Sequence, residues 1–200
     1  MNGTQSRGGV EEGAVKVVVG GDYERKSSGV RAWELTLRAL LFGLTLAAAI
    51  VLGTDKQTTT VPVQISASLP PITLSTTAKW QYSSAFVFFV VANAIACGYA
   101  ALSFLVLLFS RGRKAATTVA LITMADIITV ALLFSGCGAG AAVGIIGKYG
   151  NTHMRWKKAC NVFGGFCDRV MAAFVLSLVG SLGFVLLASF SVMGLRRSLN

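Results

Sequence analysis

Asp126 is the residue of this chain that most clearly offers chemistry, because it lies alone in a long apolar stretch. Residues 115–147 carry no other charge, and they are numerous enough to cross a bilayer, which takes roughly 20 mostly apolar residues. A carboxylate in such a segment costs about 2.5–3.5 kcal/mol on insertion scales, so Asp126 should face protein or water rather than lipid. Because a lone intramembrane acid can act as a proton or ion site, one hypothesis is a small channel or transporter that uses Asp126.

Arg38 is a second charged residue that we expect inside the membrane boundary. Residues 39–54 carry no charge but are too few to span on their own, so the first helix must include Arg38. Counted from Arg31, Arg38 lies about 10 Å along its helix at 1.5 Å per residue. Counted from Lys114, Asp126 lies about 18 Å along its own helix. Two interpretations stay open: Arg38 extends to the cytoplasmic headgroups, or it pairs with Asp126.

The cysteines fall into two kinds by position. Cys160 and Cys167 lie in a polar loop at a spacing that suits a disulfide, provided that the loop faces an oxidising compartment. Cys97 and Cys137 lie inside apolar segments, where a cysteine acts as a small apolar side chain. We therefore predict one disulfide and two free thiols.

Other chemistry lacks the residues that it needs. His153 is the one histidine, so no histidine-based zinc cluster can form, and a solvated loop side chain is expected. Residues 136–141 match the letters of a dinucleotide-binding fingerprint, but no strand precedes them and they lie late in an apolar helix. No nucleophile–base pair is apparent. We therefore predict no enzyme activity, no cofactor and no metal site.

The composition indicates a membrane protein. Charged residues make up 13% of the chain and hydrophobic ones 54%, whereas an average soluble domain is about 25% charged. The net charge of +10 can indicate nucleic acid binding, but here the basic residues flank apolar runs. We therefore expect the lipid bilayer as a partner and no nucleic acid.

The apolar runs predict an all-α fold, an integral membrane bundle of four transmembrane helices within residues 33–197. Residues 1–28 are rich in glycine and mixed charges, which is typical of a disordered tail. In the first loop, apolar and polar residues alternate over 61–69, which favours a small extracellular β-hairpin; a Ser/Thr-rich tether without fixed structure is the alternative. The helices are expected at about 33–53, 83–110, 115–147 and 170–195.

Small residues recur every fourth position on each predicted helix, a spacing that lets membrane helices approach closely. In the third helix they are Gly136, Gly140 and Gly144, and at 100° per residue Gly144 shares a face with Asp126. We expect some of these seams to pack inside the bundle and the rest to form contacts between protomers. The other helices carry Ala39, Gly43 and Ala47; Ala92, Ala96 and Ala100; and Ala173, Ser177 and Ser181.

The basic residues that flank the helices predict that both termini lie in the cytosol. Basic residues gather before the first helix, in the short second loop and at the C-terminus. Loop 148–169 is also basic, and by the same rule this would place that loop in the cytosol, against the orientation predicted by the other basic flanks. We side with the first helix and the short second loop, because Cys160 and Cys167 in loop 148–169 suit the oxidising side.

Several motifs together carry a family resemblance. They are Arg38, Phe89-Val-Val-Ala-Asn-Ala-Ile95 with Cys97-Gly-Tyr99, Asp126, Gly150-Asn-Thr152, Trp156, Cys160 and Phe166-Cys-Asp-Arg169. With these residues the sequence resembles the Casparian strip membrane protein family of plants, in its broader Casparian strip membrane protein-like branch. The resemblance covers about residues 33–197.

The resemblance implies a multi-pass plasma-membrane protein with cytosolic termini that forms homo- and hetero-oligomers with related membrane proteins. It also implies a self-associating scaffold that organises a membrane subdomain, which in strip-forming members recruits cell-wall-modifying proteins. Residues 61–69 stand where those members carry an aromatic-rich signature, so a role in the Casparian strip itself is not carried over. The alternative function remains a channel or transporter that uses Asp126.

Overall fold

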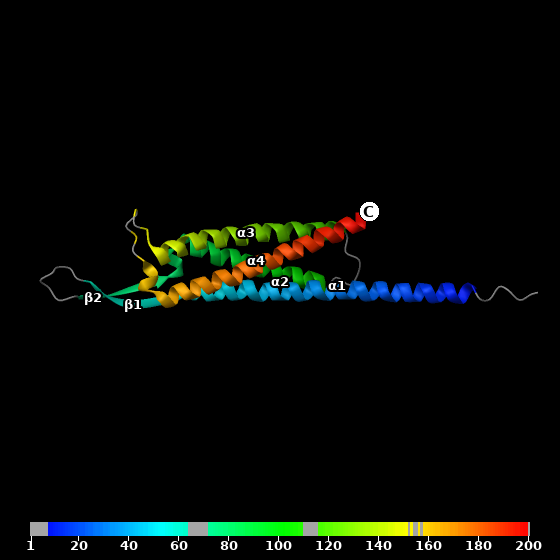
Figure 1. Cartoon of the computed structure of the whole chain (residues 1–200), viewed down its shortest axis with the longest axis horizontal. Coiled ribbons are helices and arrows are strands. Elements are labelled where there is room, and N and C mark those ends of the chain that lie inside the picture. Colours follow the sequence, from blue (N-terminus) through cyan, green and yellow to red (C-terminus); the bar gives the residue numbers. More distant parts are fainter. Residues whose placement is uncertain are drawn as a thin grey trace, which may run out of the picture.

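The computed structural model describes residues 8–63, 72–109, 116–151, 153, 156 and 158–199. Four long helices dominate it, joined at one end by a two-stranded antiparallel hairpin and two short 3-10 helices (Figure 1). The predicted all-α class with a small hairpin is confirmed. The elements are α1 (Gly8–Gly53), β1 (Lys56–Val63), β2 (Ile72–Lys79), η1 (Trp80–Tyr82), α2 (Ser84–Phe109), α3 (Ala116–Tyr149), η2 (Ala159–Asn161) and α4 (Gly164–Leu199).

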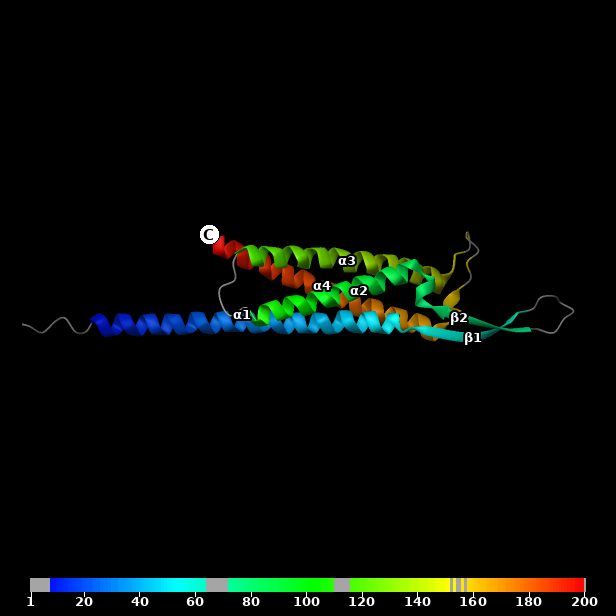
Figure 2. The same cartoon turned by 180° about the vertical axis from the view of Figure 1, so that it is seen from behind.

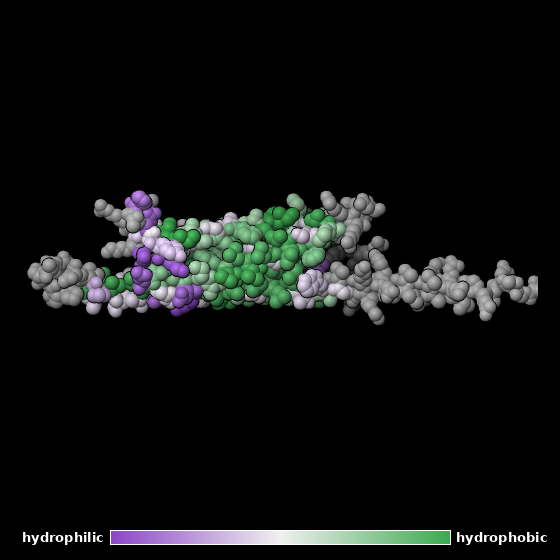
Figure 3. Space-filling model, in the orientation of Figure 1, coloured by the Kyte–Doolittle hydropathy of each residue, from purple (hydrophilic) through white to green (hydrophobic). Residues whose placement is uncertain are grey.

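Each of the four long helices contains a segment that can cross a membrane. Among the described residues these segments are 31–53, 84–109, 117–149 and 164–193. Large apolar side chains such as Leu40, Ile128 and Leu182 point outward from the bundle, and Figure 3 shows the hydrophobic surface that results. An outward apolar surface suits lipid rather than water, so the predicted membrane bundle is confirmed.

The helices are arranged so that consecutive ones are neighbours. α1 packs against α2 and α4, and α3 also packs against α2 and α4, which leaves α1 and α3 on a diagonal. We call the end of the bundle that carries β1, β2 and η2 the hairpin end; α1 continues beyond the bundle at the opposite end (Figures 1 and 2).

Most of the predicted small-residue seams lie inside the protomer. A methyl group added at Gly136 would lie 3.3 Å from Ala92 Cβ of α2, and one at Gly140 would lie 2.7 Å from two ring carbons of Phe174 of α4. The seams of α2 and α4 are fully buried, at Ala92, Ala96 and Ala100 and at Ala173, Ser177 and Ser181. On α1, by contrast, Ala39 and Gly43 are exposed, and no atom lies within 4 Å of a methyl group built at Gly43.

Two helices begin earlier than the sequence predicts. α1 starts at Gly8, so residues 8–28 are helical where a disordered tail was expected; residues 1–7 lie outside the described residues. Extending an existing helix needs no new nucleus, and the first proline is Pro62. α4 starts at Gly164 rather than near residue 170. Of the hairpin, residues 64–71 also lie outside the described part, so most of the alternating stretch 61–69 is not described.

The glycine seam of α3 gives a stability prediction with a matched control. Gly140→Ala should destabilise the bundle by about 1–3 kcal/mol, because the Phe174 ring already packs edge-on against Phe89 with centroids 5.0 Å apart and has little room to move. Gly138→Ala gains the same helix propensity in open space and should not destabilise. Unfolding of both variants in bilayer discs checks this, and equal stabilities would contradict the packing described.

Candidate functional site

Arg38 and Asp126 meet in the interior of the bundle across the diagonal between α1 and α3. Arg38 Nη2 lies 3.1 Å from Asp126 Oδ2 and Arg38 Nη1 lies 3.2 Å from Asp126 Oδ1, so the two side chains form a two-point ion pair. Both residues are fully buried. The structure thus brings together the two charges that the sequence placed in the membrane, and Arg38 does not extend to the headgroups.

α2 completes this charge network with two hydroxyl groups. Arg38 Nη1 donates to Ser103 Oγ at 2.9 Å, and the Tyr99 hydroxyl lies 2.7 Å from Asp126 Oδ1 and 2.9 Å from the carbonyl of Ile122. The single hydroxyl proton of Tyr99 favours the carboxylate, because hydrogen bonds to charged acceptors are the stronger ones. Three helices therefore contribute to one buried network.

Sequence reasoning named Tyr99 only within a family motif and gave neither Tyr99 nor Ser103 a role in the charge network. Both are uncharged residues in an apolar helix, where polar side chains are common enough to attract no attention. The available signal was their spacing, because residues four apart lie on one helix face. Asn93 was also missed as a buried polar group: its Nδ2 donates to the Phe89 carbonyl at 2.9 Å, and Oδ1 has no partner among the described residues.

A second ion pair lies at the hairpin end. Arg169 Nη1 of α4 lies 2.6 Å from Oδ1 of Asp55, which directly precedes β1 and is 1% exposed. Burial raises the pKa of Asp55, and the neighbouring guanidinium of Arg169 opposes that rise. This ion pair joins the start of the hairpin to the second turn of α4.

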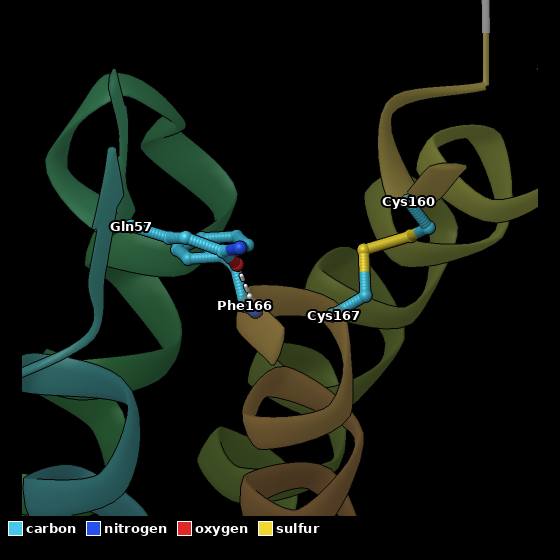
Figure 4. Close-up of a disulfide and its surroundings, with 4 residues drawn as sticks. All are labelled: Gln57, Cys160, Phe166 and Cys167. Atoms are coloured by element: carbon cyan, nitrogen blue, oxygen red, sulfur yellow. Dashed lines mark hydrogen bonds between the residues drawn. A yellow bond between two sulfur atoms is a disulfide. The ribbon is translucent and has the colours of Figure 1, made fainter. Parts of the chain in front are cut away.

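The predicted disulfide between Cys160 and Cys167 is present, two residues before Arg169 (Figure 4 shows the disulfide). It connects η2 to the first turn of α4. One residue before Cys167, the backbone N–H of Phe166 donates to Oε1 of Gln57 in β1 at 2.7 Å, which satisfies one of the free N–H groups at the helix start. The hairpin end is therefore a set of linked contacts between β1, η2 and α4.

The remaining candidates take no part in a cluster. His153 is exposed, and its backbone N–H donates to Oδ1 of Asn151. Cys97 and Cys137 are free and buried, with Cys137 Sγ 3.4 Å from Ser177 Oγ. Among the described residues no group of three or more His, Cys, Asp or Glu side chains could hold a metal ion.

Comparison with known proteins points to one family. A family model described as the Casparian strip membrane protein domain matches residues 27–183. CASP-like protein 1E1 of Glycine max is 54% identical over 164 residues, which is 82% of this chain and 87% of that protein. CASP-like protein 1E2 of Vitis vinifera is 47% identical over 195 residues, 96% of this chain and 95% of that protein. No solved structure matches the chain.

The charge network predicts strong coupling between its two ions. Arg38→Ala and Asp126→Ala should each cost about 3–5 kcal/mol of bundle stability, because the first leaves Asp126 buried without its counter-ion and the second leaves Arg38 with the partly exposed Glu34, 3.7 Å from Nη2, as its nearest acid among the described residues. The double variant should lose less than the sum by about 1–3 kcal/mol, since neither charge is then stranded. Unfolding in bilayer discs measures the cycle, with the exposed Ser135→Ala on α3 as a control. Simply additive losses would mean that the two residues do not interact.

Proposed function

Because the chain belongs to the Casparian strip membrane protein family, we propose that it is a self-associating scaffold that organises a subdomain of the plasma membrane and catalyses no reaction. Its partners are further copies of itself and related membrane proteins. At the hairpin end it recruits proteins that modify the cell wall. The scaffold role is the one that the family resemblance implies, and the contact surface between protomers is the outward face of α1.

The observation that carries the proposal is the contrast between the seams. The predicted seams of α2, α3 and α4 are used for packing inside one protomer. On α1, Ala39 and Gly43 of the predicted seam face outward, between the exposed apolar side chains of Leu40 and Leu46. Small residues four apart let two membrane helices approach closely, so we assign the contact with a second protomer to this face of α1.

The charge network supports a scaffold over a channel or transporter. Both oxygens of Asp126 accept hydrogen bonds from within the protomer, and its charge is balanced by Arg38. An acid that binds a permeating ion or proton needs a free oxygen and a polar path. Loss of ion flux in Asp126→Asn liposomes, with flux present in the natural protein, would reverse this preference.

In the proposed orientation both termini lie in the cytosol and the hairpin end lies outside. Exposed aromatic side chains mark both membrane–water interfaces, with Tyr82 and Tyr149 at the hairpin end and Trp33 at the other. The orientation itself rests on the basic residues before the membrane-spanning part of α1 and in the loop between α2 and α3. The Cys160–Cys167 disulfide also suits the oxidising side of the membrane.

If the exposed face of α1 forms the contact between protomers, a bulky side chain on that face should increase lateral diffusion of the protein. Fluorescence recovery of a tagged copy in a plant plasma membrane should show a clustered, immobile pool. Gly43→Leu should shrink that pool, because leucine separates the paired α1 helices, while a Cβ at position 43 meets nothing within 4 Å inside the protomer. Gly98→Leu tests the exposed pair Ala94 and Gly98 on α2 in the same way and should have the smaller effect; a larger effect there would place the contact on α2. Free diffusion of the natural protein would contradict the scaffold.

The orientation can be tested with an engineered glycosylation site. Gln64→Asn creates an Asn-Ile-Ser acceptor between β1 and β2, which should be glycosylated in microsomes if the hairpin end lies outside. The natural acceptor Asn2-Gly3-Thr4 at the other end is the internal control and should stay unmodified. Modification at Asn2 and none at position 64 would show that the protein has the opposite orientation in the membrane.

A further inference from the structure

The first turns of α4, residues 164–169, depend on contacts from outside the helix. The helix opens with Gly164 and Gly165, and glycine is the least favourable helix residue after proline. The sequence alone placed the helix start near residue 170. Something other than intrinsic propensity must therefore hold these residues in the helix.

Residues 164–169 are held by the buried Phe166 ring, which packs against Phe86, and by three polar or covalent contacts. Two of these three come from the hairpin and the residue directly before it. Cys167 is bonded to Cys160, the Phe166 N–H donates to Gln57 Oε1 at 2.7 Å, and Arg169 Nη1 lies 2.6 Å from Asp55 Oδ1. Figure 4 shows Gln57 reaching Phe166 beside the disulfide. The three contacts fall on residues 166, 167 and 169. Unwinding of residues 164–169 would therefore break both links to the hairpin together.

The hairpin has little else to hold it in place. It is two-stranded, and an isolated two-stranded hairpin is marginally stable at best in water. Its base touches the bundle through Ala78, which packs against the core cluster. Farther out, Ile72 and Leu74 are 53% and 57% exposed. Docking of the hairpin therefore relies on its contacts with α4.

We propose that the Cys160–Cys167 disulfide is a redox-sensitive switch that controls docking of the β1–β2 hairpin onto α4. A dithiol reductant would supply the chemistry. One of its thiolates attacks a cysteine sulfur, the S–S bond breaks and a mixed disulfide forms; its second thiol then closes into a disulfide and releases the protein. Two electrons and two protons pass to the protein, which ends with two thiols. Residues 164–169, the first two turns of α4, then fray, and the hairpin loses Gln57 and Asp55 as anchors.

The position of the disulfide suits such a switch. Cys160 and Cys167 are both partly exposed, so a reductant can reach them, whereas the free Cys97 and Cys137 are buried between membrane helices. Linkage requires the effect to be reciprocal: if the disulfide favours docking, then docking must favour the disulfide. This reciprocity separates a switch from a disulfide that only stabilises its own loop.

The test uses the full chain in bilayer discs and dithiothreitol as the probe. Amide hydrogen exchange over residues 56–63, 72–79 and 164–169 should become about fivefold faster or more on reduction, as the loss of one hydrogen bond implies. Exchange in the membrane-embedded part of α2 should not change, which shows that the bundle stays folded. Unchanged exchange in the hairpin of the reduced protein would overturn the proposal.

The reciprocal arm uses two neighbouring substitutions on opposite faces of β1. Gln57→Ala should raise the equilibrium constant for reduction by about fivefold, measured by maleimide labelling against the ratio of reduced to oxidised dithiothreitol. Thr58→Ala removes an exposed hydroxyl whose partner within the described part of the chain is Thr77 across the strands, so it should leave that constant unchanged. Equal constants for the two variants would overturn the proposal, even if the scaffold function holds.

Discussion

The buried ion pair between Arg38 and Asp126 is the interaction on which the bundle depends. Either charge alone would be costly in a membrane interior, and neither can be hydrated where it lies. The pair is favourable only with its geometry intact, because a buried ion pair must recover its desolvation cost through close contact and hydrogen bonding. Here both Nη atoms of Arg38 are bonded, while its buried Nε has no partner among the described residues. Since α1 and α3 are on a diagonal, this requirement constrains both helices and α2, which supplies Tyr99 and Ser103.

At the hairpin end, too, paired groups hold separate elements together. An ion pair, a side-chain hydrogen bond and a disulfide link the start of the hairpin and η2 to the first two turns of α4. The ion-pair network and the hairpin end therefore have different structural roles. The inner network specifies which helices meet, and the outer contacts specify how the loops are held, while the outward face of α1 remains available for association through Ala39 and Gly43.

The sequence predicts the membrane class and the disulfide, and it leaves a pair between Arg38 and Asp126 as one of two interpretations. Charges are rare in apolar segments and costly without a partner, whereas two cysteines in a polar loop suit a disulfide. The sequence predicts less about Tyr99 and Ser103, whose hydroxyl groups become visible only when α2 lies beside the pair. Periodicity identifies Gly140 as a close-packing position, but it cannot tell which helix supplies Phe174. The early start of α4 at Gly164 escapes prediction because tertiary contacts override the low helix propensity of glycine.

The most direct test of the central ion pair is a solid-state NMR measurement in bilayers of the dipolar coupling between guanidinium ¹⁵N of arginine and side-chain carboxyl ¹³C of aspartate. From the side chains that the structure describes we expect two short-range signals, one from Arg38 and Asp126 and one from Arg169 and Asp55. Asp126→Asn should remove the first and leave the second. If the natural protein lacks the coupling that Asp126→Asn is expected to remove, the pair does not form in the membrane and the account is wrong.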